Sequence, residues 1–184
     1  MTSRATVEGG ERLRLFCALT LPEPVLDGFV SWQRRELPLD VRVVPRENLH
    51  VTVAFLGPRP AADVPRVAAE LEAAAAAGGP IRFAVDRYRE TRSVGMLALD
   101  DADGHAGRFA LDVFARLERL GVYEPERRPW LPHVTALRFR LPPRLQPSLP
   151  DLGEFSPSGA AVYLSELRPG GAQYVVLESF GLGG

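Results

Sequence analysis

The order of strand-forming and helix-forming segments restricts this chain to few architectures. Three amphipathic segments are separated by pairs of short apolar segments rather than by single ones. The first predicted helix begins at Pro22 and Pro24, with an inner stripe of Val25, Phe29 and Trp32 at helical spacing. The other predicted helices cover 63–77 and 106–120, and the predicted strands cover 14–19, 41–44, 49–56, 81–85, 94–99, 132–139, 160–167 and 172–180. This order favours an α+β fold with largely antiparallel sheets over a doubly wound parallel sheet.

The length of 184 residues suits one domain, or two lobes that share a core. We expect a flexible leader over 1–12 and a single domain over 13–184, since no linker is long enough to separate independent domains. No apolar run has the roughly 18 residues that a membrane span needs. The first residues lack the apolar region of a secretory signal, so we expect a cytoplasmic protein. Nothing in the composition demands a dimer, and we expect a monomer.

The composition excludes several classes of chemistry. Cys17 is the single cysteine, which excludes an internal disulfide and a cysteine-rich zinc site. All 22 basic residues are arginine, so a lysine Schiff base and a P-loop lysine are excluded. Any bound anion must be held by guanidinium groups, hydroxyls or backbone amides. The net charge of −1 argues against a long nucleic acid, but a short RNA end or a nucleotide fits.

Two of the three histidines stand in the same short motif. His50 and Thr52 lie in LHVTVAF, and His133 and Thr135 lie in PHVTALR. Side chains at i and i+2 of a strand point to the same face, so each histidine projects together with its threonine. The intervening residues, with Val53 and Phe55, should then point into the core. Two adjacent strands would bring two imidazoles and two hydroxyls to one groove.

Such a group suits phosphodiester hydrolysis without a metal or other cofactor. One imidazole can take a proton from water while the other protonates the departing alkoxide. The hydroxyls can donate to the non-bridging phosphate oxygens. A lone histidine on a strand is more often structural, but the duplication favours the catalytic interpretation. His105 lies in a turn before a helix, where we expect a surface or capping role. The histidines and Cys17 do not match known zinc-ligand spacings.

Four segments, in this order, resemble the two-histidine (2H) phosphoesterases, specifically the RNA 2′,3′-cyclic phosphodiesterase family, which is LigT/ThpR-like and was historically called 2′-5′ RNA ligase. The segments are RLFCALTLPEPV, PRENLHVTVAFLG, RPWLPHVTALRFR and SELRPGGAQYVVLESF. The resemblance extends over about residues 13–180. It implies a bilobal fold of two antiparallel sheets with outer helices, related by pseudo-two-fold symmetry around a central cleft.

The resemblance also implies site residues. His50 and His133 would be catalytic, and Thr52, Thr135 and Arg138 would bind phosphate. Strand parity alone turns Arg138 away from His133 unless the strand bulges, and on this point we follow the resemblance.

Further roles are implied for the first strand and for the two histidines. Phe16 would stack on a nucleobase, with core packing an equal alternative. The implied reaction opens a terminal RNA 2′,3′-cyclic phosphate to a 2′-phosphomonoester, with reversible 2′-5′ ligation of RNA. His133 would act as general base on water and His50 as general acid to the 3′ oxygen. No metal is implied.

One segment departs from the family pattern, because 94–99 (VGMLAL) lacks the aromatic residue that relatives often carry there. Trp130 could provide a stacking surface, although packing beneath its loop is favoured. Two other functions stay open. One is a phosphodiesterase for a small cyclic nucleotide or a 2′-5′ oligonucleotide. The other is a nucleotide-binding module without turnover.

Overall fold

The computed structural model describes residues 11–183, and its elements follow the predicted order. The elements are β1 (Arg12–Thr20), α1 (Glu23–Glu36), β2 (Arg42–Val43), the short 3-10 helix η1 (Arg46–Asn48), β3 (Val51–Pro60), the 3-10 helix η2 (Ala61–Asp63), α2 (Val64–Ala77), β4 (Ala84–Glu90), β5 (Val94–Asp100), α3 (His105–Arg119), β6 (His133–Arg138), β7 (Gly159–Arg168) and β8 (Gly171–Phe180). The α+β fold is therefore confirmed. The predicted leader falls mostly on residues 1–10, which lie outside the described residues, and Arg12 already belongs to β1.

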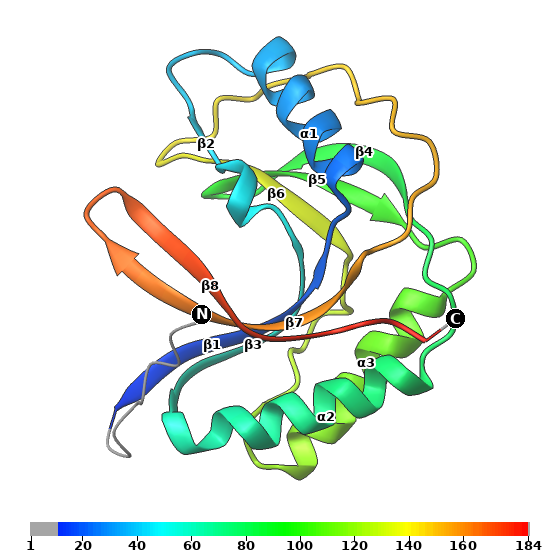
Figure 1. The fold of residues 1–184 in the computed structure, drawn as a ribbon. Coiled ribbons are helices and arrows are strands. Elements are labelled where there is room, and N and C mark those ends of the chain that lie inside the picture. The colour runs from blue at the N-terminus through cyan, green and yellow to red at the C-terminus, as the bar shows by residue number, and fades with distance from the viewer. Residues whose placement is uncertain (1–10, 184) are drawn as a thin grey trace.

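The strands form one curled antiparallel sheet in the order β4-β5-β6-β3-β1-β7-β8, with β2 paired to the far end of β6. The two expected sheets are thus two halves of a continuous one. A single residue pair, Val51 opposite Val134, joins β3 of the first half to β6 of the second. Because so little pairing links the halves, the sheet can bend sharply there. Figure 1 shows β6 and β2 facing the β7–β8 hairpin across the concave side.

The helices cover the outer side of this curl (Figure 1). Helix α2 packs against β7, β8 and α3, while α3 contacts β3. Helix α1 covers the second half, and its stripe of Val25, Phe29 and Trp32 is buried as predicted. Gln33, on the same helix, is only 5% exposed, and its amide donates to two backbone carbonyls beneath it. Of the helices described over 11–183, none has the length and apolarity for crossing a membrane.

Each half contains a β-bulge at the same place in its histidine motif. Ala18 pairs with Thr52 and Cys17 with Ala54, so Val53 has no partner of its own on β1. Met96 pairs with Thr135 and Gly95 with Leu137, which leaves Ala136 without a partner on β5. Both unpaired residues follow the motif histidine by three positions. A bulge reverses the alternation of side chains that follow it.

The two bulges overturn two expectations that assumed regular strands. Phe55 was predicted to enter the core, but it is 47% exposed and lies opposite Phe16 on the concave face. Arg138 follows its bulge in the same way and turns to the face of His133, where parity in a regular strand had placed it on the opposite side. The two residues occupy equivalent positions in the pseudo-symmetric halves.

Candidate active site

Both motif histidines are held by the same backbone contact. Nδ1 of His50 lies 2.8 Å from the carbonyl oxygen of Asn48, and Nδ1 of His133 lies 2.8 Å from that of Leu131. A carbonyl only accepts, so Nδ1 carries the proton in each ring. In the neutral ring Nε2 is then an acceptor. The hydroxyl of Thr52 lies 2.9 Å from Nε2 of His50 and donates to it.

The four motif residues line two adjoining cavities on the concave face. The larger, of about 560 Å³, is lined by His133 and the loop 125–131, and we call it the loop cavity. The smaller, of about 460 Å³, is lined by His50, Thr135 and the β7–β8 hairpin, and we call it the hairpin cavity. Thr52 and Phe55 line both. The structure therefore brings the two motifs to one continuous cleft, as their spacing and order predicted.

Arg138 lines the hairpin cavity together with His50, Thr52 and Thr135. The positive charge of Arg138 disfavours protonation of His50 and so helps to lower the pKa of that imidazole. The bulge at Ala136 thus explains why simple parity failed for Arg138, while its phosphate-binding role stays a prediction.

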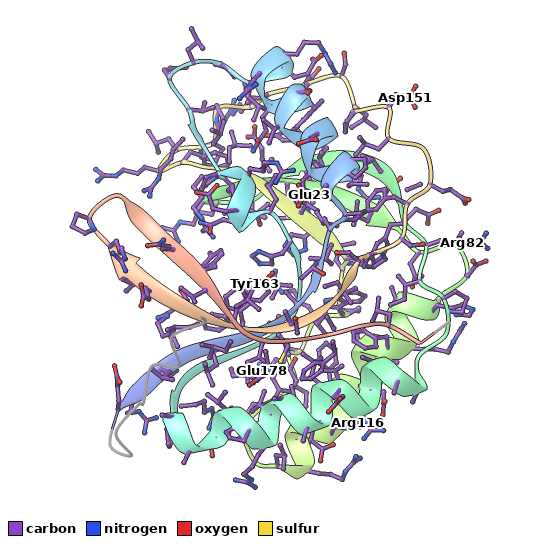
Figure 2. All side chains as sticks on the ribbon, in the orientation of Figure 1. Glu23, Arg82, Arg116, Asp151, Tyr163 and Glu178 are labelled. Carbon is purple, nitrogen blue, oxygen red and sulfur yellow. The ribbon has the colours of Figure 1, made fainter. Side chains whose placement is uncertain are left out.

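His50 is enclosed by aromatic rings. The ring centroids of Phe16, Tyr163 and Tyr174 lie 5.0, 5.7 and 5.3 Å from that of His50. Burial lowers the pKa of His50 to about 4, and repulsion from Arg138 and from the imidazolium form of His133 adds to the shift. The unliganded protein therefore holds this imidazole neutral at pH 7. Figure 2 shows Tyr163 on the inner side of the curl, whereas the labelled Arg116 lies out on the helices.

Phe16 supports this enclosure. It is 3% exposed and stacks on Tyr163 at a centroid distance of 4.9 Å and an interplanar angle of 5°. With His50 packed against the same ring, little of its surface is left for a nucleobase. The geometry favours the packing alternative, and the exposed ring of Phe55 is the better platform for a base.

The other singled-out residues have clear positions. Trp130 is partly buried and donates from Nε1 to the carbonyl of Thr52 over 3.0 Å, so the loop before the second motif is tied to the strand of the first. His105 is the first residue of α3 and lines neither cleft cavity. The carboxylate of Asp101 caps that helix by accepting from the amides of Ala106 and Gly107.

Sequence reasoning missed several residues that line the cleft. Arg14 lies over the ring of Phe55 at 5.1 Å, and Arg42 lines the hairpin cavity from β2. Asn48 donates from its side chain to the carbonyl of Ala172 over 2.8 Å, which ties the hairpin to the turn before His50. A signal was present, since Arg14 and Arg42 are charged residues within or beside apolar strand segments, where a charge needs a functional explanation.

Comparison with known proteins identifies the family of this chain. The family model described as "LigT like Phosphoesterase" matches residues 19–93. A curated protein of Thermus thermophilus, named RNA 2′,3′-cyclic phosphodiesterase, is 34% identical over 94% of this chain and 91% of its own length. This chain belongs to the LigT-like 2H phosphoesterase family. It is therefore an enzyme, a phosphoesterase. A Methanocaldococcus jannaschii protein with the same name is 24% identical over 91% of this chain and all of its own length.

Solved structures share the fold. The crystal structure of TT0787 of Thermus thermophilus superimposes with a TM-score of 0.79 and 34% identity, covering 92% of this chain and 98% of that one. The structure of E. coli LigT complexed with 3′-AMP gives a TM-score of 0.79 at 22% identity, over 95% of this chain and all of the other. The curled sheet with outer helices is thus the fold of this family.

Proposed function

We propose that this protein hydrolyses terminal 2′,3′-cyclic phosphates of RNA to 2′-phosphomonoesters by an acid–base mechanism of His50 and His133. The observation that carries the proposal is that each ring is held through Nδ1 by a backbone carbonyl, so that Nε2 is the proton-transfer atom of both. In the free protein Nε2 of His50 accepts from Thr52, and this bond is given up when the hydroxyl turns to a phosphate oxygen. Two positioned proton-transfer groups are needed for hydrolysis and not for binding alone. The name of the curated relatives supports the same reaction.

The reaction needs one bond to form and one to break. Nε2 of His133 takes a proton from water, whose oxygen attacks phosphorus. The bond from phosphorus to O3′ breaks, and His50 protonates O3′, which leaves a 2′-phosphomonoester and a free 3′-hydroxyl. Thr52, Thr135 and Arg138 hold the non-bridging oxygens, on which negative charge builds up. Both proton transfers are supplied by imidazoles, so the reaction requires no metal.

His50 must gain its proton when the substrate arrives. Its pKa is lowered by burial and by the nearby positive charges, so the free enzyme holds it neutral. A phosphate anion between the rings opposes both effects, because it stabilises the charged imidazolium. Substrate binding and protonation of His50 are therefore coupled in this mechanism.

The same site can form 2′-5′ linkages if a 5′-hydroxyl of RNA replaces water as the nucleophile. A small cyclic nucleotide or a 2′-5′ oligonucleotide would meet the same groups. A binding module without turnover is disfavoured by the second imidazole.

The expectations of a monomer and of a cytoplasmic location stay predictions, and light scattering tests the first.

One assay separates these functions. The protein is incubated in EDTA with an RNA oligonucleotide that ends in a 2′,3′-cyclic phosphate, beside His50→Ala and His133→Ala variants. We expect hydrolysis by the parent and a loss of about 10²- to 10⁴-fold in each variant. Activity that appears only with added metal would overturn the mechanism. Tight binding without turnover would favour the binding module.

A modified substrate assigns the two roles. A cyclic phosphate with sulfur in place of O3′ has a thiolate leaving group, which needs no general acid. We expect this substrate to restore activity to His50→Ala but not to His133→Ala. The opposite pattern would exchange the acid and the base.

A further inference from the structure

Positive charge in the hairpin cavity exceeds what one cyclic phosphate requires. Four arginines line the cavity, and none of its lining residues is acidic. They are Arg14, Arg42, Arg138 and Arg168. A cyclic phosphodiester carries a single negative charge, and guanidinium groups are the preferred partners of phosphate in proteins. The surplus indicates a ligand with more than one phosphate group.

The four arginines differ in the groups that their guanidiniums contact. Arg168 pairs with Glu166 at 2.6 Å, and Arg14 lies over the ring of Phe55. Within residues 11–183, no salt bridge engages Arg42 or Arg138. Arg14 has no salt bridge among these residues either, but its guanidinium lies on the ring of Phe55. Arg42 and Arg138 are therefore the cations that neither a carboxylate nor an aromatic ring engages.

Arg42 and Arg138 lie directly opposite each other on β2 and β6. Like charges at opposite positions of an antiparallel pair destabilise the sheet, and a bound anion removes that repulsion. Arg138 is the one whose charge acts on His50. We therefore assign Arg138 to the scissile phosphate. Arg42 lies on β2, the strand next to β6.

The hairpin fixes the position of Arg42. Its guanidinium donates to the carbonyl of Gly170 over 2.6 Å. The next residue, Gly171, has a φ of 121°, and a Cβ atom there would overlap with Nη2 of Arg42. The backbone conformation favours glycine at 171, and any side chain there would displace the guanidinium of Arg42. This contact holds Arg42 at the cavity wall before any ligand binds.

We propose that Arg42 binds a second phosphate group of the substrate, attached to the 5′ oxygen of the nucleotide that carries the cyclic phosphate. The inference rests on the proposed function and deepens it. The enzyme would select ends of RNA chains or 5′-phosphorylated nucleotides over nucleosides that carry the cyclic phosphate alone.

The test compares ligands that differ only in the 5′-phosphate. A nucleoside 2′,3′-cyclic phosphate and its 5′-phosphorylated form are compared by kcat/KM. A nucleoside 2′-phosphate and the matching 2′,5′-bisphosphate are compared by Kd in calorimetry. We expect the parent to prefer the 5′-phosphorylated member of each pair by about tenfold or more. In Arg42→Gln both ratios should fall close to one, and Gly171→Ala should lower them because it displaces Arg42.

Arg12→Gln is the matched control. Arg12 also donates to a backbone carbonyl, that of Pro58 at 2.8 Å, but it lines neither cavity. Its ratios should stay those of the parent. Equal Kd values for the two ligands in the parent, or a preference that survives in Arg42→Gln, would overturn the inference. Absence of hydrolysis with both cyclic substrates would contradict the proposed function, while the Kd ratio still decides the role of Arg42.

Discussion

The burial of His50 makes the stability of the protein depend on pH, because it lowers the pKa of the imidazole. The folded protein holds its pKa near 4, whereas an exposed histidine in the unfolded chain titrates near 6.5. Between these values the unfolded chain binds a proton that the folded protein does not. The contribution of neutral His50 to stability is therefore complete above about pH 6.5 and is lost as the pH falls to about 4.

We predict that the parent loses more stability on acidification than a His50→Gln variant does. The difference follows from the extra proton of the unfolded parent and amounts to about 3 kcal/mol at its full extent. Urea denaturation near pH 7 and near pH 4 measures it, and other groups cancel between the two proteins. Equal losses in the two proteins would show that burial does not keep His50 neutral.

Ligand binding should act on the same ring in the opposite direction. An anion in the cleft opposes the repulsion from Arg138, so we predict that a nucleoside 2′-phosphate raises the pKa of His50 from about 4. Nitrogen-15 NMR of the imidazoles follows the change. The signals of His105, which lies outside the cleft, provide the reference. An unchanged titration of His50 in the complex would contradict the coupling of protonation to binding.

A side chain of α1 is hydrogen-bonded to the bulge of strand β6. The amide of Gln33 donates to the carbonyls of Val44 and Ala136, both at 2.9 Å, and so binds the bulge that turns Arg138 into the cleft. Replacing the amide leaves these buried carbonyls with fewer donors, which typically costs about 1–3 kcal/mol.

We predict that Gln33→Met lowers both stability and kcat/KM. The loss of kcat/KM should depend on Arg138, so that Gln33→Met has a much smaller effect in an Arg138→Gln background. Such non-additivity in a double-mutant cycle identifies Gln33 as a positioning residue. Gln146→Met, at an exposed position, is the control and should change neither quantity. Strict additivity would mean that the bulge does not depend on Gln33.

The elements were predictable and the bulges were not. Hydrophobic periodicity located α1 through Val25, Phe29 and Trp32, and the i, i+2 rule placed Thr52 beside His50. A bulge depends on which residues pair across strands, and Val53 and Ala136 carry no local sequence signal for it. For that reason Phe55 was assigned to the wrong face. Arg42 was missed although its charge interrupts the predicted apolar strand 41–44, because nothing local shows which cavity that strand will border.

The molecule as a whole depends on how its two halves are held around the cleft. Sheet pairing between them is limited to Val51 and Val134, whereas the proposed mechanism needs His50 of one half and His133 of the other at fixed separation. The hydrogen bond from Trp130 to the carbonyl of Thr52 adds a second connection beside the site. A shift of about 1 Å between reacting groups can cost about 10²-fold in rate.

We predict that Trp130→Phe lowers kcat/KM for the cyclic phosphate by about tenfold or more, because the indole N–H that links the halves is removed. Trp32→Phe is the matched control. It removes an equivalent bond from an indole N–H to the carbonyl of Ser148, at 2.6 Å, and neither of these residues lines the cleft cavities. Trp32 is fully buried, so its replacement should lower the free energy of unfolding at least as much. Only Trp130→Phe should change turnover after both are compared well below their melting temperatures. Equal losses of kcat/KM in the two variants would mean that turnover follows general stability, and that the link between the halves has no separate effect on catalysis.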